Sequence, residues 1–237
     1  MRNFTFRFFS ILTLLFFIIV TALSLLEFDN SITSDDLLYA EKIRTEYTID
    51  TIHRFDSYRN EVVFIKQIQH AVNTFALIGD GIPMHHERNI KDLYLSKKGL
   101  CYDRSHVIEK LLRVYGFETR HVSMYFYGNI IEKITAIINP HSQSHAVTEV
   151  KTSRGWMVVD SLFDIVGISE TGDPLSLTQV RNLIENNQSN TPITNNVSYI
   201  KPFVFSYGIY SRNGKLYPPY NSIPDFQFCE IKYNFFD

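Results

Sequence analysis

The chain has 237 residues, of which 45% are hydrophobic and 14% aromatic, enough to bury one sizeable core in a single domain with extensions. Its 23 Lys and Arg residues nearly balance its 25 Asp and Glu residues, which leaves a net charge of −2. Such a chain offers no basic field for nucleic acid, so that class of partner is disfavoured.

The first predicted element is an apolar segment, residues 8–26, which contains no charge, proline or glycine. As a helix it would be about 28 Å long, close to the thickness of a bilayer's hydrocarbon core. Arg2 and Arg7 precede it and acidic residues follow it, so the positive-inside rule predicts a single-pass anchor with the domain on the extracytoplasmic side, periplasmic or extracellular. The alternative is a signal peptide cleaved near Val20–Ala22, which would release a secreted protein.

Composition divides the rest of the chain into a polar spacer and a domain. Residues 1–28 form the anchor or signal segment, residues 29–57 a helical spacer whose helix begins near Ser34, and residues 58–237 the domain with an aromatic-rich C-terminal extension. The domain opens with a core helix, because a set of mostly apolar positions keeps helical spacing; these positions are Val62, Ile65, Ile68, Gln69, Val72, Phe75 and Ala76.

A cysteine at a predicted helix start is the strongest chemical signal in the chain. Gly99 allows a turn, Cys101 follows it, and an amphipathic helical pattern runs from there to Gly116. Unpaired backbone N–H groups and the positive end of the helix dipole favour a thiolate over a thiol at this position. Cys101 is therefore the candidate nucleophile.

The residues after this helix favour a sheet. Residues 117–127 predict a strand, and residues 130–138 form an apolar piece whose secondary structure the periodicity leaves open. Residues 145–151 and 154–161, rich in Val, Trp and Thr, predict a β-hairpin.

The hairpin places a histidine and an aspartate on one face. With Thr152 and Ser153 as the loop, His145 pairs directly with Asp160 and their side chains lie about 5 Å apart. Moving the loop by one residue makes the two residues diagonal neighbours on the same face. Asp160 can then accept from one imidazole nitrogen while the other faces Cys101, provided that the cysteine helix packs on this face.

The chain after the hairpin predicts one helix and two less regular segments. A short helical pattern covers residues 175–184, and residues 185–200 have the composition of a mobile polar loop. Many aromatic residues follow. Their favoured role is to cover the sheet and close the core, and the alternative is that some line a cleft leading to Cys101.

No metal or organic cofactor is expected. The run that begins at His85 lacks the second histidine one helical turn after Glu87 that a zincin requires, and His141 and His145 are four residues apart in a stretch that Pro140 makes a loop.

At these residues the chain resembles the transglutaminase-like superfamily of papain-related cysteine enzymes. The resemblance covers roughly residues 60–165 and rests on Gly-x-Cys at a helix start, on the order Cys, His, Asp, and on Leu112, Arg113, Phe117, Arg120, Val122, Glu149 and Trp156. It implies an α+β fold in which the nucleophile helix packs on an antiparallel sheet. It also implies that Cys101, His145 and Asp160 are nucleophile, general base and orienting acid.

The expected function is acyl transfer or hydrolysis at carboxamide or peptide bonds of a protein or peptide, through a thioester, by a membrane-anchored member of bacterial type. A hydrolase is the first choice because the chain lacks the extra β-domains of animal cross-linking enzymes. The alternatives are a cross-linking transglutaminase and a non-catalytic tethered module of an envelope polysaccharide or secretion system. A disulfide between Cys101 and Cys229 would abolish the nucleophile, and an inert buried thiol is the plain alternative for Cys101.

Overall fold

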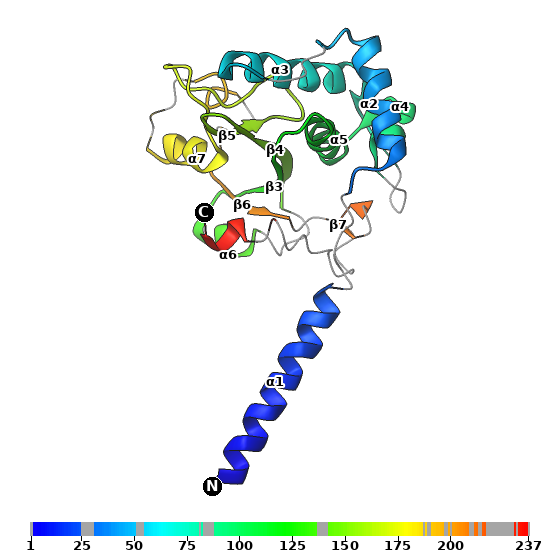
Figure 1. Ribbon diagram of the computed structural model, residues 1–237. Coiled ribbons are helices and arrows are strands. Elements are labelled where there is room, and N and C mark those ends of the chain that lie inside the picture. Colours follow the sequence, from blue (N-terminus) through cyan, green and yellow to red (C-terminus); the bar gives the residue numbers. More distant parts are fainter. Residues whose placement is uncertain are drawn as a thin grey trace.

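The computed structural model describes residues 2–24, 31–50, 55–80, 82, 88–136, 142–186, 188, 191–196, 199, 201–208, 211–212, 215–216, 230 and 232–236. Its centre is a four-stranded antiparallel sheet with strand order β5-β4-β3-β6 (Figure 1). The strands are β3 (Thr119–Phe126), β4 (Ser144–Thr152), β5 (Gly155–Val159) and β6 (Phe203–Tyr207). This mixed architecture with an antiparallel sheet agrees with the predicted α+β class.

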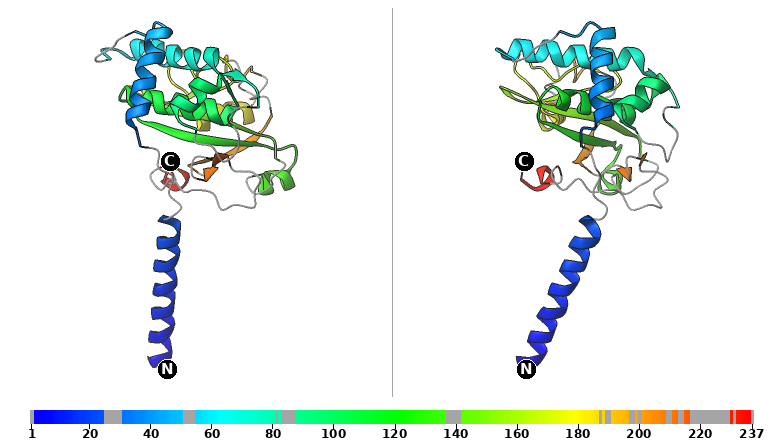
Figure 2. Two further views of the ribbon diagram at one scale, coloured as in Figure 1. Left: turned by 90° about the vertical axis from the view of Figure 1, so that its right-hand side faces the viewer. Right: turned by 45° about the vertical axis from the view of Figure 1, so that its right-hand side comes forward.

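Helices cover both faces of the sheet, and each face has its own apolar core (Figure 2). One core joins α2 (Ser34–Glu46), α3 (Tyr58–Phe75), α4 (Ile90–Ser96) and α5 (Cys101–Val114) to one face of the sheet. The opposite core packs α7 (Leu177–Glu185) and the side chains of Ile193 and Tyr199 against the other face. Nearly every residue of β3 and β4 is buried, and because successive side chains of a strand point to opposite faces, each face of the sheet carries a core.

The remaining described elements are small. A two-stranded parallel sheet joins β1 (Leu77–Ile78) to β2 (Lys98–Gly99), and an antiparallel one joins β7 (Ser211–Arg212) to β8 (Lys215–Leu216). Helix α6 (Ile130–Thr135) follows β3, and α9 (Tyr233–Phe236) lies close to the C-terminus. The sequence left the secondary structure of residues 130–138 undecided, and the structure shows a helix as far as Thr135. Residues 137–141 lie outside the described residues.

The predicted spacer helix is an integral part of the domain. Helix α2 begins after the N-cap Thr33, as the sequence predicts, but it packs into the first core through Ala40 and Ile43. Its buried Asp36 carboxylate forms an ion pair with Lys110 of α5 at 2.7 Å. Helix α2 therefore packs on α5, the helix that begins at Cys101, instead of standing apart from the domain.

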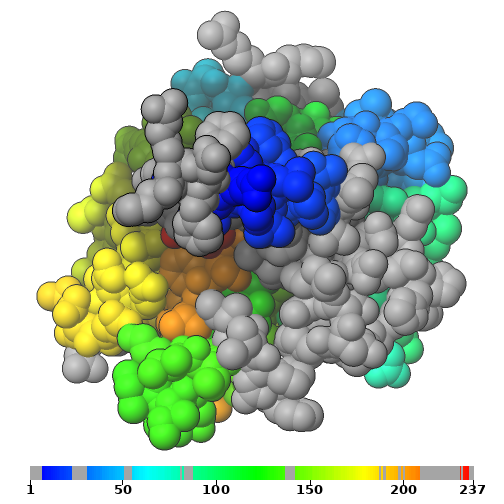
Figure 3. Space-filling view, turned by 90° about the horizontal axis from the view of Figure 1, so that it is seen from below, coloured from blue at the N-terminus to red at the C-terminus, as the bar shows by residue number. Residues whose placement is uncertain are grey.

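The N-terminal helix α1 (Arg2–Ser24) stands away from the domain in all ribbon views (Figures 1 and 2), and in the view from below it lies in front of the domain, in blue (Figure 3). Among the residues that the structure describes, no helix combines the length and the apolarity that crossing a bilayer requires. The predicted span of residues 8–26 continues past Ser24 into residues outside the described part. Within α1, the large apolar side chains from Phe8 to Val20 are exposed.

The segment predicted as a mobile polar loop contributes to the second core. Of residues 185–200, Ile193 and Tyr199 are completely buried in that core, and Thr191 and Thr194 hydrogen-bond to each other beside it. The prediction was wrong for these residues, because a polar composition does not reveal the few apolar side chains that anchor a loop.

The aromatic residues of the described C-terminal part cover the sheet, as favoured from the sequence. Phe203 and Tyr207 of β6 are buried in the second core, and Phe205 and Tyr233 pack against it. The aromatic residues between 217 and 228 lie outside the described residues.

Candidate active site

Cys101 is the first residue of α5, and the local sequence explains why it sits there. Leu100 is the extended N-cap residue, and its backbone N–H donates to the Asp103 carboxylate at 2.9 Å, which closes the first turn. Gly99 is required just before it, because a Cβ atom at this position would lie 2.6 Å from the Leu93 side chain. Gly116, with φ of +89°, follows the other end of the helix.

The Cys101 thiol is free and half-buried. This free thiol argues against the alternative of a disulfide with Cys229, a residue that lies outside the described part of the chain. A half-buried thiol at a helix start can accept a small reactant while it remains in the field of the helix dipole.

The hairpin brings His145 and Asp160 together through the diagonal register. Thr152 pairs with Gly155, so the loop is shifted by one residue from the first expectation, and His145 and Asp160 are diagonal neighbours. The His145 Nε2 and the Asp160 Oδ2 are 2.9 Å apart, and both side chains are buried.

Helix α5, which begins at Cys101, packs on the opposite face of the sheet from the one expected. Thr148 of β4 donates to the Ser105 carbonyl of α5 at 2.8 Å, so α5 covers the Thr148 face. His145, three residues earlier in the strand, points to the other face, where its ring lies 6.5 Å from that of Tyr199. Cys101 therefore approaches His145 at the end of β4, and the site straddles the end of the sheet.

The electrostatics of the site favour a charged pair. Burial raises the pKa of the Cys101 thiol, but the His145 imidazole and the backbone N–H groups of Ala146 and Tyr102 act more strongly together and leave that pKa below its usual value. Burial lowers the pKa of His145, but the hydrogen bond to Asp160 and the charge of that carboxylate, with smaller contributions from Cys101, raise it to about 10. Both shifts favour the thiolate and imidazolium forms over the neutral thiol and imidazole.

The two imidazole nitrogens have different neighbours. Nε2 bonds to Asp160, which leaves Nδ1 for the thiol of Cys101. Nδ1 is buried and has no hydrogen bond of ordinary geometry, although the thiol and the imidazole are close enough to shift each other's pKa. This loose contact is common in free enzymes, where catalytic hydrogen bonds tighten only when substrate binds.

Asp160 is a fully buried carboxylate with four hydrogen-bond donors. Oδ1 accepts from the backbone N–H groups of Leu162 at 2.6 Å and Phe163 at 2.8 Å. Oδ2 accepts from His145 and from the Tyr199 hydroxyl, the latter at 2.7 Å. Burial raises the pKa of Asp160, but these partners outweigh it and hold the pKa below its usual value.

Two residues that support this arrangement were missed in the sequence. Tyr199 lies in a polar segment that carries no signal of a buried role. Gln69 of α3 donates through Nε2 to the carbonyls of Asp160 at 2.7 Å and Ile165 at 2.7 Å, so it holds the turn that follows β5. A signal for Gln69 existed, because it is the polar member of an otherwise apolar helix face.

An acyl-transfer site needs hydrogen-bond donors for the oxyanion, and the backbone N–H of Cys101 is the candidate for the first of them. Tyr94 and Asn89 are candidates for the second because they lie close to Cys101 in the sequence, but both side chains have other partners. The Tyr94 hydroxyl donates to the Glu46 carboxylate, and the Asn89 side chain accepts from Lys110 at 2.8 Å.

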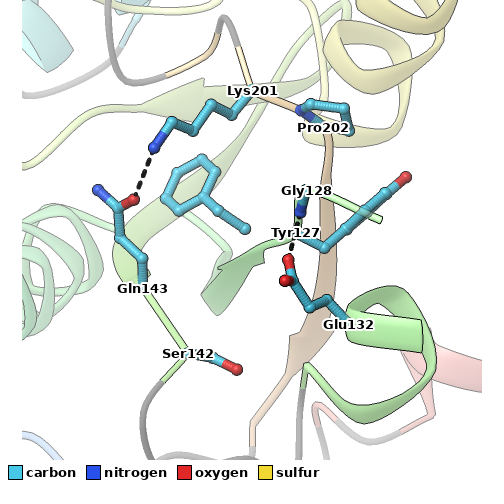
Figure 4. Close-up of a pocket in the computed structure, with 8 residues that line it drawn as sticks. Tyr127, Gly128, Glu132, Ser142, Gln143, Lys201 and Pro202 are labelled. Atoms are coloured by element: carbon cyan, nitrogen blue, oxygen red, sulfur yellow. Dashed lines mark hydrogen bonds between the residues drawn. The ribbon is translucent and has the colours of Figure 1, made fainter. Parts of the chain in front are cut away.

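A pocket of about 500 Å³ lies beside Ser142 and Gln143, which precede β4 (Figure 4). Gln143, two residues before His145 and thus about 7 Å along an extended strand, accepts a hydrogen bond from the Lys201 ammonium group at 3.1 Å across this pocket. On the other side, the Glu132 carboxylate accepts from the Gly128 N–H at 2.6 Å. The pocket is lined by Phe126, Tyr127, Gly128, Glu132, Ser142, Gln143, Lys201 and Pro202.

The described residues contain no group of three or more His, Cys, Asp or Glu side chains that could hold a metal ion. The run His85-His86-Glu87 and His141, which were considered as ligands, lie outside the described residues.

Comparison with known proteins gives one match. Residues 83–161, about a third of the chain, match the family model of the transglutaminase-like superfamily. This range contains Cys101, His145 and Asp160 and supports a papain-like cysteine enzyme family, whose members are in general cysteine-dependent enzymes. No curated protein and no solved structure matches the chain.

Proposed function

We propose that the protein is a cysteine enzyme in which Cys101, His145 and Asp160 form a catalytic triad for acyl transfer at carboxamide or peptide bonds. The observation that carries this proposal is the chain of contacts from a free thiol at a helix start, through a histidine with a raised pKa, to a buried carboxylate. The family match over the same residues supports it.

The mechanism uses each member of this chain of contacts in turn. The Cys101 thiolate attacks the substrate carbonyl carbon, and the His145 imidazolium gives its proton to the departing amine, which leaves a thioester on the sulfur. Neutral His145 then takes a proton from water as the water attacks the thioester, and the carboxylic acid and the thiolate are released. Asp160 orients the imidazole and stabilises its positive charge throughout.

Hydrolysis is the first choice, with a protein or peptide of the cell envelope as the substrate. An amine in place of water would make the same site a cross-linking transglutaminase, and the low exposure of His145, 4%, favours this second candidate because a dry site protects a thioester from water. A non-catalytic binding module is the remaining alternative, and the depressed pKa of Cys101 argues against it.

The proposal includes a membrane anchor. Residues 8–26 would span the bilayer and hold the domain on the extracytoplasmic side, with Arg2 and Arg7 in the cytoplasm. The exposed apolar side chains along α1 support this part of the proposal, since such surface is otherwise covered in a folded protein. Retention in the membrane pellet after alkaline carbonate extraction is the expected result, and a mature N-terminus just after Ala22 would instead indicate a cleaved signal peptide.

Thiol labelling tests the triad without a known substrate. In a Cys229→Ser background, the rate of alkylation of Cys101 by iodoacetamide should rise at a lower pH than that of a free thiol, whose pKa is about 8.5. His145→Ala should move the rise to the pH of an ordinary thiol. An unshifted rise in the parent protein would refute the ion pair, and incorporation of monodansylcadaverine into acceptor proteins would separate amine transfer from hydrolysis.

A further inference from the structure

The Tyr199 hydroxyl shares one carboxylate oxygen with the histidine of the site. It donates to Asp160 Oδ2 at 2.7 Å, and His145 Nε2 lies 2.9 Å from the same atom. Two backbone N–H groups occupy Oδ1, so all four hydrogen bonds of the carboxylate run in fixed directions. With Tyr199 in place, one direction remains at Oδ2 for the imidazole.

The surroundings hold Tyr199 in this position. Its side chain is completely buried in the second core, and its ring packs edge-on against His145 at 6.5 Å and against Phe203 at 6.4 Å. The residue reaches the site from a segment 39 positions after Asp160 in the sequence, so it ties the C-terminal part of the chain to the hairpin. Its contacts with the site are to the carboxylate and the imidazole.

We propose that Tyr199 is a positioning residue of this site, which fixes the plane of the Asp160 carboxylate and thereby aims the His145 imidazole at Cys101. This inference rests on the proposed function and adds a fourth residue to its machinery. The hydroxyl acts in two ways. It orients the carboxylate, and its positive hydrogen, close to Nε2, makes the imidazolium a stronger acid and therefore a better proton donor to the leaving amine.

The other charged groups around the Cys101 thiol and the His145 imidazole come from three parts of the fold. Cys101 and Arg104 belong to α5, and the Arg104 charge acts on both the thiol and Asp160. Asp164 follows β5, and Glu149 of β4 acts on Tyr199. A substitution that removes only the hydroxyl leaves all of these groups in place, so a change in the titration of the pair can be assigned to Tyr199.

The test measures the alkylation of Cys101 by iodoacetamide against pH, in the full chain in detergent micelles with Cys229→Ser. For a thiolate paired with an imidazolium, the plot of alkylation rate against pH has two steps. The step at lower pH, the lower limb, marks the formation of the ion pair, and the step at higher pH, the upper limb, marks the loss of the imidazolium proton. In Tyr199→Phe the upper limb should move upward by roughly half to one pH unit, because the carboxylate loses a donor and holds the imidazolium more strongly.

Tyr207→Phe is the matched control. The Tyr207 hydroxyl is buried in the same core and donates to the carboxylate of Glu149 at 3.1 Å, but it touches neither member of the pair. Both variants lose one buried hydroxyl, so similar losses in Tm are expected, whereas the upper limb should move in Tyr199→Phe alone. Equal upper limbs in Tyr199→Phe and the parent protein would overturn the inference.

Two further measurements separate the possible failures. If Tyr199→Phe does not fold, meta-fluorotyrosine at position 199 keeps the shape and donates more strongly, so the upper limb should move downward, and an unchanged limb would overturn the inference. If the parent protein shows the single step of an ordinary thiol, the proposed function itself is refuted. A two-limbed parent profile with no response at position 199 refutes the positioning role alone.

Discussion

The ion pair between His145 and Asp160 should make the stability of the fold depend on pH. The raised pKa of His145 means that its stabilising effect is complete below the unfolded pKa of 6.5 and is lost as the pH rises towards about 10. At about 1.4 kcal/mol per pKa unit, the full shift corresponds to at most about 5 kcal/mol in the free energy of unfolding. Asp160→Asn removes the main cause of the shift.

The assay is urea unfolding of parent and Asp160→Asn proteins between pH 6 and pH 10. Both carry Cys101→Ala, so that the thiol does not titrate. The parent should be the more stable protein at pH 6, by several kcal/mol, and this advantage should shrink steadily towards pH 10.

A matched control comes from an exposed pair of the same chemistry. His70 Nδ1 lies 2.6 Å from the Asp164 carboxylate, with both side chains about half exposed or more, so Asp164→Asn should change the free energy of unfolding by less than about 1 kcal/mol at any pH. If the difference between parent and Asp160→Asn stayed constant across the range, the buried ion pair would not carry the charge that we assign to it.

Two substitutions test the support of the site. Gln69→Leu should lower the free energy of unfolding by about 2–4 kcal/mol, since the carbonyls that accept from Gln69 stay buried. Gln67→Leu, at a half-buried position of α3 whose Nε2 donates to the exposed Asp50 carboxylate, should lower it less, and thermal unfolding compares the two variants. Lys110→Met should cost about 3–5 kcal/mol by leaving the Asp36 carboxylate buried without its partner, whereas Lys91→Met, which breaks an exposed ion pair, should cost under about 1 kcal/mol in the same urea titration. Equal losses within either pair would contradict the burial argument.

Local patterns were sufficient to predict the parts of the site that depend on periodicity. The shared face of His145 and Asp160 follows from the two-residue period of a strand. This prediction therefore holds although the hairpin loop lies one residue further along the chain than first assumed. The helix that starts at Cys101 was predicted in the same way, from a glycine turn and an apolar repeat.

Long-range packing set the features that could not be predicted. Which face of the sheet receives α5 depends on how whole elements dock, and no pattern near Thr148 or Ser105 records it. Tyr199 joins Asp160 from a distant segment, and its partner is visible only when the chain is folded. The spacing of Ala40 and Ile43 could have predicted that one side of α2 is buried. It could not have predicted that Asp36 pairs with Lys110 of α5.

The position of the site at the end of the sheet bears on when its chemistry becomes available. The sulfur is supplied by the layer of helices on one side, and the imidazole, the carboxylate and the tyrosine hydroxyl belong to the other side. A chain in which only one layer has assembled has an ordinary protonated thiol, which is a poor nucleophile. Newly made protein would thus stay inert towards its neighbours until both layers have closed on the sheet, a built-in delay that needs no inhibitory propeptide.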